Sequence, residues 1–133
     1  MSSSTRVPRG VVAARLRQAR HLRGLSQREV GVRMGLDKDT ASARISRYES
    51  ESMTVSLESL FALASALDVP PAYLVAGTSA MADAILFMEA LSEKQQRDLA
   101  TGLASLTELS PDQRQAFIAK IASAGTEAQP MRY

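Results

Sequence analysis

Residues 26–50 carry the signals of two helices joined by one short turn, and this pattern constrains the fold more than any other part of the chain. Ser26 followed three residues later by Glu29 is a capping box, which satisfies two backbone N–H groups that the first turn of a helix leaves unpaired. Gly35 predicts the end of that helix. The next helix is predicted to run through Ser50, and its competent N-caps are Asp37, Asp39 and Thr40.

Three further helices are predicted to surround this pair. A helix from Val11 to about Arg23 ends at Gly24, and its buried face is predicted to comprise Val12, Leu16 and Ala19. Ser56 caps a later helix, whose apolar face is predicted to comprise Leu57, Leu60, Phe61, Ala64 and Leu67. Pro70-Pro71 opens a short last turn, because proline is tolerated at a helix start. The sequence therefore predicts an all-α unit of five helices.

The remaining chain is interpreted as a helical segment that follows a linker at Gly77-Thr78-Ser79. It has three amphipathic stretches with apolar residues at helical spacing. Their faces are Met81, Ala84, Ile85 and Met88, then Leu99, Leu103 and Leu106, and finally Phe117, Ile118 and Ile121. Ser92 and Ser110 are predicted to cap the last two helices. The predicted organisation is a flexible basic arm at 1–10, a domain at 11–77 and a helical C-terminal segment at 78–133.

Charge is divided unevenly along the chain, although the net charge is only +2. Residues 1–50 hold 11 Lys and Arg against four acids, whereas residues 51–133 hold five against ten. A basic front half favours a polyanionic partner, but a solvated basic face explains the same charge equally well. Charge alone leaves both alternatives open.

Composition argues against several classes of function. The chain has no cysteine and a single histidine, His21, so it offers no disulfide, thiolate metal site, thiol nucleophile or histidine cluster. It shows no paired acid/base constellation and no Gly-rich phosphate loop, so we predict neither an enzyme nor a cofactor. The N-terminus lacks the apolar stretch of a signal peptide, and no apolar run approaches the roughly 18 residues of a membrane helix. We expect a cytoplasmic protein without a metal or a membrane contact.

Several motifs occur together and in order in the first part of the chain: LSQREV (25–30), MGL (34–36), ISRYE (45–49), SLESL (56–60), LASALDV (63–69) and YL (73–74). They resemble the helix-turn-helix core of the Cro and lambda-repressor family, over residues 11 to about 76. The resemblance implies a five-helix lambda-repressor-like domain that binds double-stranded operator DNA, normally as a dimer on a two-fold site.

The resemblance also implies which residues contact DNA. Base-edge contacts come from the first two turns of the recognition helix, where the candidates are Ser42, Ala43, Arg44 and Arg47. Ser46 is predicted to face away from the core, where it is free to contact DNA. Lys38 and Thr40 are predicted to contact phosphates or the edge of the groove. Gln27 resembles the family's phosphate-contacting glutamine, and Arg28 beside it is a further candidate. The structural alternatives are a tolerated first-turn glutamine, helix-capping side chains, and an arginine paired with Glu51.

Other residues are predicted to hold the two helices together. Gly31 lies where they meet, and the absence of a Cβ permits close approach. Ile45 and Tyr48 are predicted to anchor the recognition helix in the core. Glu49 occupies the family's position for an acid that braces the helices internally, so we do not predict a DNA contact for it.

The interval at 36–44 departs from the family pattern, because it is longer by about one helical turn. Either the turn is longer, or the recognition helix gains a turn at its N-terminus. A second ambiguity concerns Arg6 and Arg9, which either reach DNA as a basic arm or belong to a disordered tail.

The C-terminal helices have narrow apolar stripes that bury little by themselves. They are predicted to form a homodimer, and the alternative is that they fold back on their own domain. The leading functional hypothesis is a dimeric repressor of phage or mobile-element type. The alternative is an antitoxin-like interaction module that binds a protein partner through its C-terminal helices and DNA secondarily.

Overall fold

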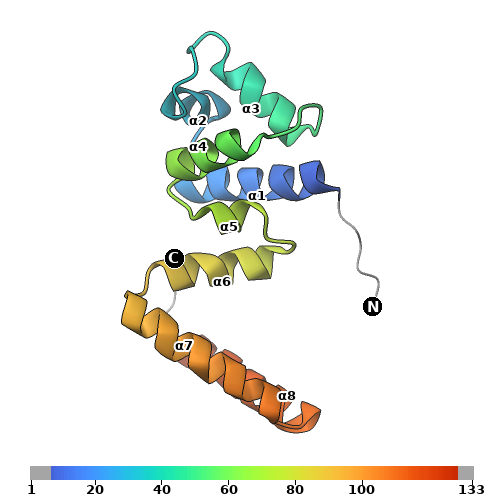
Figure 1. The fold of residues 1–133 in the computed structure, drawn as a ribbon, viewed down its shortest axis with the longest axis vertical. Helices are drawn as coiled ribbons and strands as arrows, with labels where there is room; N and C mark the ends of the chain where they lie inside the picture. The colour runs from blue at the N-terminus through green and yellow to red at the C-terminus, as the bar shows by residue number, and fades with distance from the viewer. Residues whose placement is uncertain (1–6, 129–133) are drawn as a thin grey trace. The chain divides into compact units, whose positions relative to one another are not determined.

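The computed structural model describes residues 7–128, and within that range the chain is all-α, with no strand (Figure 1). The elements are α1 (Pro8–Arg23), α2 (Gln27–Arg33), α3 (Ala41–Glu49), α4 (Leu57–Leu67), α5 (Pro71–Leu74), α6 (Ser79–Glu89), α7 (Glu93–Ser105), the 3-10 turn η1 (Leu106–Glu108) and α8 (Pro111–Ala128). This agrees with the all-α fold class predicted from the sequence.

The chain divides into two compact units, Met1–Ala90 and Leu91–Tyr133. The first contains α1 to α6 and holds the main core. Its largest fully buried side chains come from α1, α2, α3, α4 and α5, and they are Leu16, Val30, Ile45, Leu63, Leu67, Tyr73 and Leu74. Fully burying one Leu, Ile or Val contributes about 1.5–3 kcal/mol, so this cluster is the main source of stability for the unit.

The predicted serine caps are present. Ser26 Oγ accepts a hydrogen bond from Glu29 N at 3.0 Å, and Ser26 N donates to Glu29 Oε1 at 3.2 Å, which completes the capping box. Gly24 ends α1 in the left-handed conformation with φ 65°. Ser56 caps α4, and Ser110 forms a reciprocal pair with Gln113 at the start of α8.

The predicted start of the first helix was wrong by three residues. α1 begins at Pro8 rather than Val11, because the fixed φ of proline suits the first helical position and its missing N–H is not needed there. Arg9 is therefore helical and donates to the carbonyl of Glu51 at 3.4 Å, so it does not belong to a flexible arm. Arg6 lies outside the described residues.

The buried face of α4 also differs from the prediction. Leu57 and Phe61 are 67% and 56% exposed, whereas Leu63, which the sequence analysis left out, is fully buried. Two apolar stripes overlap on this helix and share Leu60, Ala64 and Leu67 at helical spacing. Periodicity cannot choose between them, and packing against the core selects the stripe that contains Leu63.

Helix α6 packs on α5 and α1, so the first unit continues past the linker predicted at residues 77–79. Thr78 is the N-cap of α6, and its hydroxyl accepts a hydrogen bond from Met81 N at 3.1 Å. The predicted apolar face is rotated: Met81 is 57% exposed, and Ala84 is exposed too. The face that meets the core consists of Ala82, Ile85 and Leu86.

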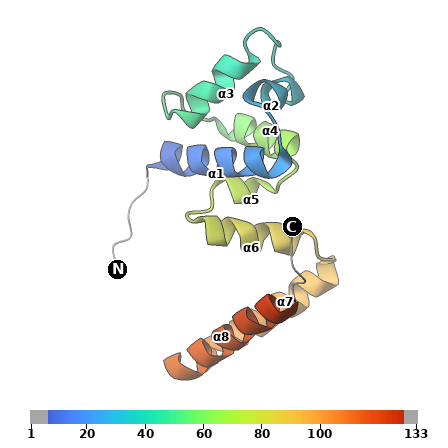
Figure 2. The same ribbon diagram turned by 180° about the vertical axis from the view of Figure 1, so that it is seen from behind.

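The second unit has no buried side chain among its described residues. Its chain reverses direction at η1, and Arg114 holds the reversal by donating to the carbonyls of Leu106 at 3.1 Å and Leu109 at 3.3 Å. Figure 2 shows α8 returning after this turn. Several large apolar side chains of this unit are about half exposed to solvent: Leu103, Phe117, Ile118 and Ile121. Over residues 7–128, no helix has the length and apolar character needed to span a bilayer.

Candidate nucleic-acid interface

Helices α2 and α3 pack at very short range through Gly31. A Cβ placed on Gly31 would lie 2.6 Å from Ala41 Cβ and 2.8 Å from both Ala41 Cα and its carbonyl oxygen. Real Cβ atoms do not approach other atoms so closely, so glycine is required for this contact. The predicted role of Gly31 is confirmed, and Ala41, fully buried at the start of α3, is the partner that the sequence analysis did not name.

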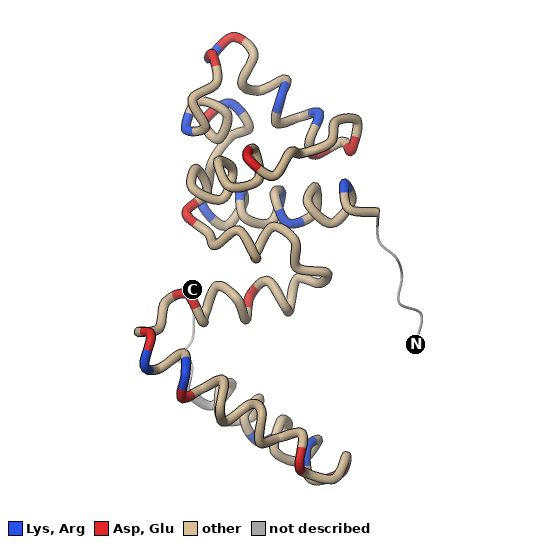
Figure 3. Tube along the Cα trace, in the orientation of Figure 1, with Lys and Arg blue, Asp and Glu red and all other residues tan. Residues whose placement is uncertain are grey.

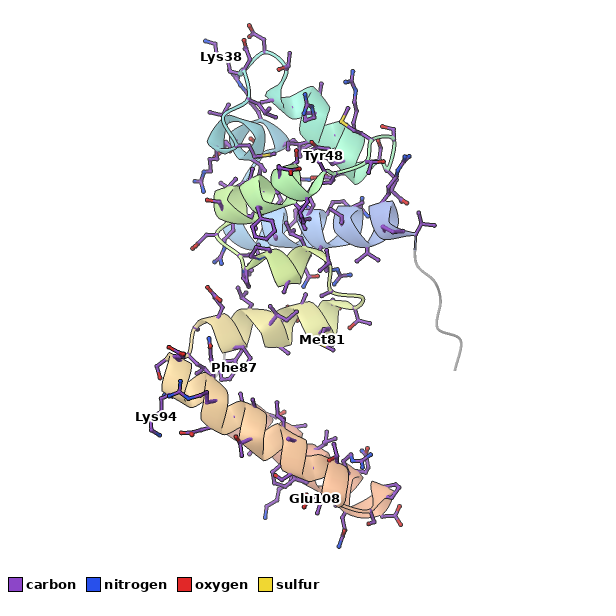
Figure 4. All side chains as sticks on the ribbon, in the orientation of Figure 1. Lys38, Tyr48, Met81, Phe87, Lys94 and Glu108 are labelled. Carbon is purple, nitrogen blue, oxygen red and sulfur yellow. The ribbon has the colours of Figure 1, made fainter. Side chains whose placement is uncertain are left out.

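The extra residues before the recognition helix form a longer turn rather than an extra helical turn. α3 begins at Ala41, and its N-cap Thr40 has no side-chain cap hydrogen bond. Asp37 organises the turn: its carboxylate accepts from Asp39 N at 2.9 Å, and its carbonyl accepts from Ala41 N at 2.8 Å. Lys38 extends from the tip of this loop (Figure 4). The loop thus exposes the ammonium group of Lys38 between two acidic residues, Asp37 and Asp39.

Helix α3 separates its core side from its outer side cleanly. Ile45 and Tyr48 are 0% and 2% exposed, as predicted for the two anchors, and Figure 4 shows Tyr48 between α3 and α4. At about 100° per residue, Ala43 lies opposite this buried side. Ser46 and Arg47 flank Ala43, and all three are exposed.

The two remaining candidates on α3 lie at the rims of its outer face. Ser42 is exposed at one rim, and Arg44 is half-buried at the other. The five predicted DNA-contacting residues of α3 therefore occupy one continuous face of the helix. Their contact with DNA is a prediction that the geometry permits.

Glu49 braces α3 against two other helices. Its carboxylate, with the side chain 7% exposed, accepts from Arg20 Nε at 2.8 Å and from Arg20 Nη2 at 3.0 Å. The Glu49 carbonyl accepts from Arg17 at 2.6 Å. This planar two-point pairing is the strong form of an arginine–carboxylate contact, and it fixes the C-terminal end of α3 on α1. The internal role predicted for Glu49 agrees with these contacts.

Gln27, the first residue of α2, contacts the same carboxylate. Its Nε2 donates to Glu49 Oε1 at 3.2 Å, which fixes the direction of the half-buried amide. The predicted phosphate contact would have to use the other amide N–H. At the same helix end, the hydrogen bonds from Ser26 hold the pKa of the exposed Glu29 carboxyl below its ordinary value.

The Lys and Arg residues that the structure describes between positions 7 and 50 fall into two groups. Arginines at six positions donate to protein oxygens: Arg9, Arg15, Arg17, Arg20, Arg23 and Arg33. Four cations have no side-chain partner among the described residues: Arg28, Lys38, Arg44 and Arg47. All four lie on α2, on α3 or on the loop between them, where Figure 3 shows the basic residues at this end of the first unit.

The structure therefore distinguishes arginines that bind oxygens of the protein from cations that are free to bind a partner. The sequence alone does not show this difference. Arg15, Arg17, Arg20 and Arg23 of α1 all donate hydrogen bonds within the first unit, so these arginines stabilise the fold. The alternative pairing of Arg47 with Glu51 is not formed. A helix pair with unpaired cations on its outer side, mounted on a small helical core, defines a protein of the helix-turn-helix class.

Comparison with known proteins agrees with this class. The family model described as Helix-turn-helix matches residues 16–74. A solved structure titled "Crystal structure of transcriptional regulator BswR" is similar, with 32% sequence identity and a TM-score of 0.64, over 70% of this chain and 92% of that chain. Comparison with curated proteins gives no match. The chain belongs to the Xre-like helix-turn-helix family, to which the predicted resemblance pointed.

Proposed function

We propose that this protein is a sequence-specific, DNA-binding transcriptional regulator of the cytoplasm, and that it acts as a dimeric repressor on a two-fold operator. The outer face of α3 enters the major groove, where Arg47 and Arg44 donate to base edges and Ala43 allows close approach. Arg28, Lys38, Thr40 and the free amide N–H of Gln27 contact the phosphate backbone.

One observation carries the proposal: the unpaired cations of the basic half gather on α2, α3 and their loop. A solvated basic face would show no such selection. Here the α1 arginines bind oxygens within the protein, and the cations without partners lie on α3, on α2 or on the loop between them. DNA binding depends on phosphate neutralisation by available Lys and Arg, so this distribution supports a polyanionic partner for this end of the unit.

Dimerisation is proposed through the second unit. Leu103, Phe117, Ile118 and Ile121 remain about half exposed, and no described side chain of the unit is buried. Short helices without a core are marginal in water, so an apolar surface of this kind favours a partner that covers it. A second copy is the proposed partner, because one helix-turn-helix unit reads only half of a two-fold site.

Random-site selection with the purified full chain tests DNA recognition. We expect enrichment of one motif in two inverted copies. Arg47→Ala should weaken binding to the enriched duplex by about 1–3 kcal/mol if Arg47 reads a guanine. Arg97→Ala is the matched control, because Arg97 is also exposed but pairs with Glu93 on α7. Equal binding by the wild-type chain and Arg47→Ala, at all salt concentrations, would refute the assignment.

Sedimentation equilibrium tests the dimer. Ile118→Asp places a charge on the exposed apolar face of α8, and we expect it to convert a dimer into a monomer. Gln115→Asp adds the same charge at an exposed polar position of α8 and should leave the dimer intact. A monomeric wild-type chain that associates only with the product of an adjacent gene would favour the antitoxin-like alternative instead.

A further inference from the structure

Helix α6 is part of the DNA-binding unit rather than a tether that follows it. Ala82 is fully buried, and Ile85 and Leu86 pack against the core cluster that includes Tyr73 and Leu74. In both views of the first unit, α6 lies beyond α5, on the side away from α3 (Figures 1 and 2). The chain therefore leaves the unit from an ordered helix at the end opposite to the candidate DNA-binding surface.

Polar contacts fix α6 on α1 as well. Gln18 Nε2 donates to Asp83 Oδ1 at 3.0 Å, and Gln18 Oε1 accepts from Arg15 Nη1 at 2.6 Å. Arg15 is only 6% exposed, and its Nε has no hydrogen-bond partner among the described residues. A buried guanidinium is costly without negative charge nearby, so the Asp83 carboxylate, linked through Gln18, favours this position of α6.

The negative charge of Asp83 also affects the pKa of Tyr73 on α5. Burial raises the pKa of its hydroxyl, and the charge of Asp83 raises that pKa further. Asp83 is therefore close enough to α5 to affect it, although its hydrogen bond is to α1. Helix α6 is thus held both by its apolar face, which packs on the core, and by the hydrogen bond from Gln18 to Asp83.

The docking of α6 sets the length of the connection to the second unit. α6 ends at Glu89 and α7 begins at Glu93, so three residues join them, and the two Cα atoms can lie at most about 14 Å apart. If α6 left its site and unfolded, the connection would begin after Ala76. A flexible chain from there to Glu93 has a root-mean-square length of about 23 Å.

We propose that the docking of α6 on α1 and α5 fixes the spacing between half-sites that the dimer accepts, with Ala82 and Asp83 as positioning residues that do not contact DNA. This inference rests on the proposed function, because it requires two DNA-binding units joined through their second units. A three-residue connection restricts the distance and rotation between two half-sites, whereas a longer flexible connection permits several spacings.

The test compares four full-length proteins in selection from a pool of duplexes with a randomised segment of about three helical turns. Ala82→Glu places a charge at the buried contact of α6, and Ala84→Glu places the same charge at an exposed position of that helix. The fourth protein has a flexible Gly/Ser insertion between Ala90 and Leu91, which lengthens the connection and leaves α6 docked. Hydrogen exchange of the α6 amides shows whether Ala82→Glu has released the helix.

The wild-type chain and Ala84→Glu should enrich the half-site at one spacing. The insertion protein and Ala82→Glu should enrich the same half-site at several spacings. Adding about 5 bp, half a helical turn, between the half-sites should weaken wild-type binding at least tenfold and insertion-protein binding less than threefold. Binding to an isolated half-site should be equal in all four proteins.

Selection of only the wild-type spacing by the insertion protein would overturn the inference, and it would do so even if Ala82→Glu did not fold. Enrichment of no inverted pair by the wild-type chain would overturn the proposed function, and this inference with it. Because the half-site motif and the spacing are read separately from the same selected duplexes, the two failures are distinguishable.

Discussion

Replacing Gly31 with alanine should disrupt the contact that sets α2 against α3. The new Cβ would meet Ala41 Cβ, Cα and carbonyl oxygen at 2.6–2.8 Å. Two of these three atoms belong to the backbone, so a change of side-chain rotamer cannot relieve the clash. One helix must move away from the other, and the outer face of α3 moves with it.

The free energy of unfolding combines two opposing terms. Alanine is more favourable than glycine inside a helix by about 1 kcal/mol, which would stabilise the variant. Overpacking of a close contact costs about 1–3 kcal/mol, and more when backbone must move. Since the contacts lie roughly 1 Å inside normal van der Waals separation, we expect the upper end of that range and a net loss of about 2 kcal/mol. The melting temperature should fall by about 8–16 °C for a unit of this size.

Urea unfolding followed by circular dichroism measures the loss, and Gly10→Ala is the matched control. A Cβ at Gly10 would meet Glu51 Oε1 at 3.0 Å, which is the far end of a flexible side chain that can turn away. We expect Gly10→Ala to be neutral or slightly stabilising. If Gly31→Ala unfolds at the same urea concentration as the wild-type chain or at a higher one, the close packing inferred for α2 and α3 is wrong.

Two further substitutions test the supports of the α2–α3 pair. Ser26→Ala should cost about 1 kcal/mol at neutral pH through loss of the cap. The Ser26 backbone N–H, which alanine also has, is the main cause of the lowered Glu29 pKa, and the Ser26 side chain lowers that pKa further. Only the side-chain contribution differs between the two proteins; it is present above the ordinary carboxyl pKa and is lost as the pH falls, so the difference between wild type and Ser26→Ala in urea unfolding should be slightly smaller in acid, and a larger difference in acid would contradict this. Glu49→Ala should destabilise the unit by about 3–5 kcal/mol, because it leaves the guanidinium of Arg20, 16% exposed, without its carboxylate. A loss below about 1 kcal/mol in urea unfolding, which is roughly the contribution of a surface ion pair, would contradict this expectation. It would show that water solvates the Arg20 guanidinium when Glu49 is absent.

The parts of the fold that sequence could predict are those with local chemical causes. Capping by Ser26 and Ser56 depends on hydrogen bonds within three residues, and the left-handed Gly24 depends on the absence of its own Cβ. The need for glycine at position 31 was also visible, since the family pattern places two helices together there. These features require no knowledge of how distant helices pack.

The wrong predictions concern faces that only tertiary packing selects. α4 carries two apolar stripes of equal periodicity, and the choice between Phe61 and Leu63 depends on the position of α1 and α5. The buried residue of α6 is Ala82, a small side chain that hydrophobic patterning ranks below Met81. Tertiary packing also decides which arginines have a partner within the protein. Arg17 and Arg47 both lie on the polar side of a predicted helix, and the sequence does not distinguish them. In the structure only Arg17 donates to a backbone carbonyl of another helix, that of Glu49.

Helix α3 carries its packing contacts and its candidate DNA-contacting residues on different sides. Glu49 and Arg47 are two residues apart, so at about 100° per residue their side chains diverge by about 160°. Glu49 binds Arg20 in the interior, whereas Arg47 has no partner among the described residues. We therefore expect substitutions on the outer face to change DNA recognition with little change in the free energy of unfolding, and substitutions at Glu49 to change both.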